Sequence, residues 1–170
     1  MTTDKTIEHA SAVVELLWPA FVEEDGAVFL RSGRLAAARP LSEFPGLLDA
    51  ECFVNHVHVL DGFEHHANLD EEPFWNPNHE DFKRAVAVAA IVAETWAARL
   101  ARDFPEESFA VFATRDDNPI VRFHKIRTDA ALYLQPEEIE RLDDGSALMI
   151  RVERGAITQR LGHLASTSTT

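Results

Sequence analysis

The chain has 170 residues, the usual size of one domain, and a formal net charge of −13, which repels phosphate backbones and anionic membrane surfaces. Apolar residues make up 46% and charged residues 26%, which excludes the composition of a disordered chain. We expect one globular domain over 1–165 and a frayed tail at 166–170. We expect no direct nucleic-acid ligand and no membrane contact.

Cysteine content and the N-terminal segment indicate the compartment. Cys52 is the single cysteine, which excludes an intramolecular disulfide and a zinc site made of several thiolates. Asp4 and Glu8 stand where a secretory signal needs a basic start and an apolar stretch. The longest uncharged apolar run, 85–93, is too short to cross a bilayer. These features predict a cytoplasmic protein.

The first third of the chain contains a predicted helix and two predicted strands. The helix begins near residue 4 and places Ile7, Val14 and Leu17 along one face. Residues 27–31 form the first predicted strand. The second predicted strand, 51–60, is rich in β-branched and aromatic side chains.

The clearest element is a helix from about residue 79 to residue 103. Asn78 is its expected N-cap, and Ile91 is expected to widen its apolar stripe. Apolar residues recur at helical spacing along one face, at Phe82, Val86, Ala89, Ala93, Trp96 and Leu100. This helix is predicted to lie on a sheet as the central element of the core.

The second half of the chain predicts the fold class. Two β-prone runs, 109–115 and 120–127, read as a hairpin, Pro136 opens a short helix, and 147–152 is a further strand. The order of elements lacks the βαβ alternation of a parallel fold. We therefore predict an α+β fold, with a mainly antiparallel sheet of about five strands packed against one long central helix and an N-terminal helix.

A histidine cluster is the first candidate site. His56, His58, His65 and His66 fall within eleven residues, with Asp61 between them. Strand alternation puts His56 and His58 on one face, where two imidazoles and a loop ligand can hold a divalent transition metal such as zinc, iron or manganese. The alternative is that the strand histidines are half-buried sheet residues and the other two are loop residues.

Arg122 and His124 share a face of the hairpin strand 120–127. If that strand lies near 53–60, they form a patch with the strand histidines that can hold an anion or a small carboxylated ligand. The alternative is a salt bridge between Arg122 and a nearby carboxylate.

Phe74 and Trp75 stand in a polar, proline-punctuated segment before the long helix. If they are exposed, they are a recognition anchor for a partner, because tryptophan buries a large area with little loss of entropy. The alternative is that they tuck under the start of the helix and close the core.

Three hypotheses of function follow. The first is an acidic, cytoplasmic protein-binding domain, similar in charge and size to inhibitor or immunity proteins, that engages a more basic partner through Phe74 and Trp75. The second is a small metal-dependent enzyme or metal-binding protein that uses the histidine cluster. The third is a subunit of a homo-oligomer whose function lies at the subunit interface.

Overall fold

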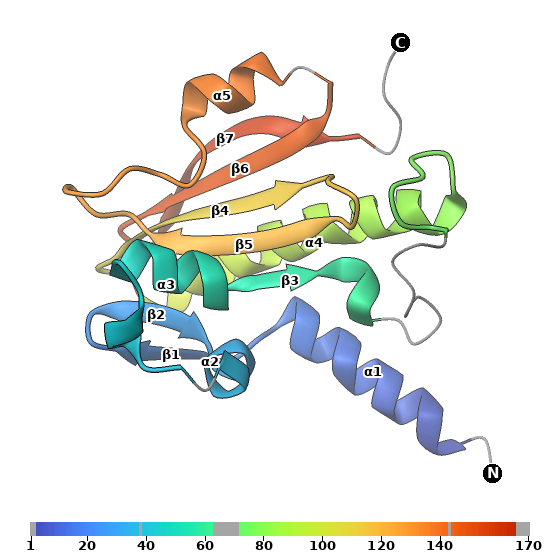
Figure 1. The fold of residues 1–170 in the computed structure, drawn as a ribbon, viewed down its shortest axis with the longest axis horizontal. Coiled ribbons are helices and arrows are strands. Elements are labelled where there is room, and N and C mark those ends of the chain that lie inside the picture. Colours follow the sequence, from blue (N-terminus) through green and yellow to red (C-terminus); the bar gives the residue numbers. More distant parts are fainter. Residues whose placement is uncertain (1–2, 38, 63–71, 143, 166–170) are drawn as a thin grey trace.

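A five-stranded antiparallel sheet backed by one long helix organises the computed structural model (Figure 1). The structure describes residues 3–37, 39–62, 72–142 and 144–165. The elements are, in chain order, α1 (Thr3–Leu17), β1 (Phe21–Glu24), β2 (Ala27–Leu30), α2 (Arg31–Ala37), η1 (Leu41–Glu43), α3 (Leu47–Val54), β3 (His56–His58), η2 (Val59–Gly62), α4 (Glu80–Asp103), β4 (Ser108–Thr114), β5 (Ile120–Lys125), α5 (Pro136–Arg141), β6 (Ser146–Glu153) and β7 (Ala156–Leu164). The predicted α+β class is confirmed.

The sheet has the order β3-β5-β4-β6-β7, and all its neighbours are antiparallel. Its composition differs from the prediction at two points. The strand predicted at 27–31 belongs to a separate two-stranded hairpin with β1, and the fifth strand of the main sheet is the unpredicted β7. Two residues with positive φ, Arg154 and Gly155, turn the chain between β6 and β7, as a tight hairpin requires.

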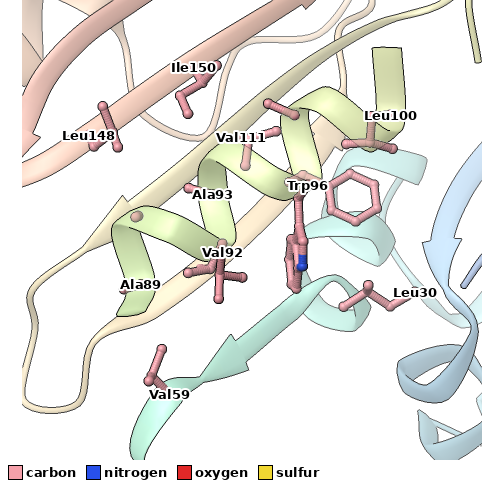
Figure 2. Close-up of a cluster of buried hydrophobic side chains, with 14 of the residues drawn as sticks. Leu30, Val59, Ala89, Val92, Ala93, Trp96, Leu100, Val111, Leu148 and Ile150 are labelled. Carbon is pink, nitrogen blue, oxygen red and sulfur yellow. The ribbon is translucent and has the colours of Figure 1, made fainter. Parts of the chain in front are cut away.

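Helix α4 forms the core as predicted, lying across one face of the sheet (Figures 1 and 2). The six apolar residues of its predicted stripe are all buried. Trp96 packs among side chains from α4, the sheet and β2, and its indole Nε1 donates to the Leu16 carbonyl over 2.8 Å. Two details of the prediction are wrong. Ile91 is 57% exposed, and the N-cap is His79, whose Nδ1 accepts from the Asp81 amide.

Helix α1 extends away from the sheet, and only its C-terminal end joins the core (Figure 1). Leu16 and Leu17 pack against the main cluster of buried residues. The predicted face is largely on the surface, since Ile7 is 71% exposed and Val14 is also exposed. The spacing of apolar residues predicted the helix but not how much of its apolar face is buried.

The strand predicted at 51–60 is wrong over most of its length. Residues up to Val54 belong to α3, and only His56–His58 is strand. The reason is a pair of side chains one helical turn apart, Glu51 and Asn55, which are fully buried against β2. Glu51 accepts from the Val28 amide, and Asn55 both accepts from Leu30 and donates to the Val28 carbonyl. These side chains bond the backbone groups at the edge of β2 that a neighbouring strand would otherwise bond.

Among the described helices, none is both long and apolar enough to cross a bilayer. The predicted tail at 166–170 lies outside the described residues.

Candidate functional site

The sheet face opposite α4 brings three of the predicted site residues together. β3 lies beside β5, and His56 is the direct antiparallel partner of Arg122. His56 and His58 lie on the same face, with ring centroids 5.2 Å apart. The condition set for this patch is met, because the topology places strand 120–125 next to the histidine strand, and the binding of a ligand there stays a prediction.

Burial separates His124 from the open part of this patch. It is fully buried, stacked on Phe112 with ring centroids 5.6 Å apart. Its Nδ1 donates to the Lys125 carbonyl, and its Nε2 accepts from the backbone amide of Tyr133 over 3.2 Å. Burial lowers the pKa of His124, which suits the neutral form that these two bonds require. His124 therefore positions Tyr133 instead of facing a ligand.

Tyr133 in turn covers Arg122. The guanidinium carbon lies 4.1 Å from the centre of the Tyr133 ring, a cation–π contact. Sequence reasoning missed Tyr133, which lies between β5 and α5 where no periodic pattern marks it. Its signal was only indirect: it is the single tyrosine of the chain, an amphipathic side chain in the connection between two predicted elements.

The predicted aromatic pair divides between core and surface. Phe74 is buried in the main core, whereas Trp75 is 52% exposed. The backbone of Trp75 is in the left-handed region, with φ 48°, and its amide donates to the Asp117 carbonyl over 2.8 Å. Phe74 therefore closes the core, and Trp75 meets the condition of exposure, while its role as a recognition anchor stays a prediction.

Asn118 joins the turn between β4 and β5 to η2. This buried side chain accepts from the Leu60 amide and donates to the Asp61 carboxylate over 2.9 Å. The Val59 amide donates to the neighbouring Pro119 carbonyl. The turn between β4 and β5 is thereby tied to η2 and to the Trp75 turn, so the groups that surround Trp75 are held by a hydrogen-bonded frame.

Two surface pockets meet at this frame. One, of about 360 Å³, has three carboxylates in its lining, those of Asp61, Asp116 and Asp117, together with Trp75 and His58. The other, of about 480 Å³, shares Trp75, Asp116 and Asp117 with the first. The tandem aspartates at 116–117 read as turn chemistry in the sequence, so their role in lining a pocket was missed.

The metal hypothesis gains no further ligand from the described residues. Within them, no group of three or more histidine, cysteine, aspartate or glutamate side chains is arranged to hold an ion. Asp61 is hydrogen-bonded to Asn118, and His65 and His66 lie outside the described residues. A metal at His56 and His58 stays a prediction.

Cys52 is a poor nucleophile in this setting. It is a free thiol on α3, and burial raises its pKa to about 11, against the weaker opposing effect of the Arg122 charge. A thiol that stays protonated at neutral pH is neither a good nucleophile nor a good metal ligand.

The fold and the site define an α+β protein with an aromatic, acid-lined pocket at one end of its sheet and a basic patch on the sheet face. The chain belongs to the Uncharacterized protein PM0498 family, whose model matches residues 3–156. No curated protein matches the chain, and no solved structure matches it.

Proposed function

We propose that this protein is a protein-binding domain that engages a more basic partner through the pocket around Trp75. The observation that carries the proposal is the juxtaposition of a half-exposed indole with Asp61, Asp116 and Asp117 in one lining. An indole face and several carboxylates are the groups that hold a lysine or arginine side chain, by cation–π attraction and by charge-assisted hydrogen bonds.

The surroundings of Trp75 support a preformed site. Phe74 anchors the turn in the core, and the amide of Trp75 is bonded to the β4–β5 turn. A side chain on such a frame loses little freedom on binding, which is how a tryptophan becomes a dominant contact in an interface. The net charge of −13 adds attraction for a basic partner at long range.

The test begins with partners that the full chain retains and the Trp75→Ala variant does not. Each partner is then purified, and its affinity is measured for the wild type, for Trp75→Ala and for Asp116→Asn/Asp117→Asn. We expect Trp75→Ala to weaken binding by roughly 30-fold, about 2 kcal/mol, as for a central interface residue. The double asparagine variant should bind more weakly and lose part of the salt dependence of association.

Two matched controls separate this pocket from a general effect. Ile91→Ala removes an exposed apolar side chain from α4, and Glu140→Gln removes one exposed charge from α5. Both should bind as the wild type does. A partner that binds Trp75→Ala as tightly as the wild type, or whose affinity ignores salt, would contradict the proposal.

A further inference from the structure

Arg122 is the exception among the partly buried arginines that the structure describes. Each other partly buried arginine in the described residues pairs with a carboxylate; these are Arg34, Arg39, Arg99, Arg115, Arg127 and Arg151. Over the same ranges Arg122 has no ion pair, and its buried Nε has no hydrogen-bond partner. In a chain with 29 acidic residues against 16 basic ones, an unpaired guanidinium is not explained by a shortage of carboxylates.

Glu51, on the helix α3 that packs on β5, already has other partners. Glu51 accepts two hydrogen bonds from Arg127, at 2.6 Å and 3.0 Å, and others from the Val28 and Lys125 amides. Its two carboxylate oxygens therefore already accept four hydrogen bonds, and none of them comes from Arg122. A buried donor left without a partner destabilises the fold, more so if it is charged, so such a group calls for an explanation.

Arg122, which ends in the guanidinium head, pairs with β3, and α3 packs on the same strand β5. Burial lowers the pKa of His56 first, and the charges of His58 and Arg122 lower it further, against the Phe53 carbonyl and Asp61. The same Arg122 charge acts on the pKa of Cys52. Tyr133 stacks on the head, and its ring is partly exposed, as is that of Phe53 beside His56. The guanidinium head thus lies against an aromatic ring that is itself partly exposed.

We propose that Arg122 is the anchor of a site for an oxyanion, the phosphate or carboxylate group of a small ligand, on the sheet face formed by β3 and β5. A guanidinium offers a planar fork of N–H donors that matches two oxygens of such a group. His56 and His58 stand on the same face as the anchor and add two imidazoles to its edge. The site shares His58 with the lining of the Trp75 pocket, but its anchor Arg122 does not line that pocket, and the proposal does not depend on the protein-binding function proposed above.

The direct readout is the Nε–H resonance of Arg122 in the wild-type chain, assigned by its absence in Arg122→Lys. The full chain is titrated with inorganic phosphate and, separately, with succinate, at constant ionic strength. We expect this resonance to shift and saturate with at least one of them. Tighter binding of phosphate identifies a phosphorylated ligand, and tighter binding of succinate identifies a carboxylate.

Affinity measurements on variants give the second readout. Arg122→Gln should weaken binding at least tenfold, and His56→Gln/His58→Gln should weaken it several-fold. Arg31→Gln, which removes an exposed arginine of α2, should change nothing. The proposal is overturned if neither anion saturates the Arg122 resonance, or if Arg122→Gln and Arg31→Gln alter the affinity equally.

Discussion

At the scale of single residues, two positions on β5 show how burial assigns different tasks to neighbouring polar groups. Arg122 and His124 lie on the same face of the strand, yet His124 is fully buried and satisfied by two backbone groups. Arg122 reaches the edge of the same face and stays without an acidic partner in the described residues. The buried imidazole fixes Tyr133, and Tyr133 fixes the guanidinium. His124 is therefore structural, whereas the Arg122 guanidinium, held by Tyr133, is the group that we propose binds an oxyanion.

The lowered pKa of His124 predicts the direction of a pH effect on stability. Burial is the largest cause, and the Arg127 charge adds to it, while the Lys125 carbonyl and Glu51 oppose it. Because the unfolded chain then binds more protons, the contribution of His124 to the free energy of unfolding is complete above about pH 6.5. It is lost as pH falls from there through the folded-state pKa. His56, whose pKa is also lowered, acts in the same direction.

The variant His124→Gln tests this effect, since its amide oxygen can accept from the Tyr133 amide without titrating. Urea unfolding measured from about pH 7.5 to about pH 5.5 brackets the free histidine value. We expect the free energy of unfolding to fall less steeply with pH in the variant than in the wild type. Equal slopes would show that His124 does not bind its proton differently in the folded and unfolded chain.

At the scale of elements, α3 is the part of the molecule where side chains replace a strand. Glu51 and Asn55 satisfy the outer edge of β2, and Glu51 also holds Arg127 and the Lys125 amide. One short helix thereby joins the β1–β2 hairpin to the end of β5. These contacts join residues far apart in the sequence, so their loss should loosen the β1–β2 hairpin and the end of β5 together.

Replacement of Glu51 by alanine should therefore be costly. It leaves the Arg127 charge and two backbone amides without their acceptor, and we expect a loss of about 3–5 kcal/mol in the free energy of unfolding. Glu51→Gln, which keeps one acceptor oxygen, should lose less. Glu107→Ala is the control, because the Glu107 side chain is 34% exposed, against 0% for Glu51, and ion pairs nearer the surface are worth about 0–1 kcal/mol. Urea unfolding measures the free energy of unfolding of all three variants. A loss for Glu51→Ala no larger than that for Glu107→Ala would refute the structural role of Glu51.

Sequence patterns predicted the elements in which one periodicity continues over several helical turns or several strand residues. The long helix and the hairpin 108–125 follow the periodicities of 3.6 and 2, and Pro136 marks the start of α5. The patterns failed at α3, where β-prone residues such as Val54 form a helix because Glu51 and Asn55 gain tertiary partners. The site was half visible: the histidines and Arg122 could be placed on faces, but Tyr133 reaches Arg122 only through the fold.

At the scale of the whole molecule, the net charge of −13 acts on folding as well as on binding. The ion pairs on the described surface are mostly local, such as Glu80–Lys83 and Asp81–Arg84 within α4. Pairs of this kind contribute about 0–1 kcal/mol each. Repulsion among the excess carboxylates is spread over the surface and works against the compact state. We therefore infer that repulsion outweighs pair attraction in the salt dependence of stability.

Raising NaCl from about 0.01 M to about 0.15 M shortens the Debye length from about 30 Å to about 8 Å. This change screens the spread repulsion more than the close pairs. We expect the folded state to gain on the order of 1 kcal/mol, which for a chain of this length is a rise of about 2–4 °C in Tm. The variant Glu106→Lys/Glu140→Lys lowers the net negative charge at two exposed sites and should gain less from salt. A Tm that falls with salt would mean that attraction within the ion pairs outweighs the spread repulsion. A variant whose Tm responds to salt as the wild type does would mean that net charge does not cause the effect. In either case the attraction expected for a basic partner would have to come from the carboxylates around Trp75 and not from the net charge of the whole chain.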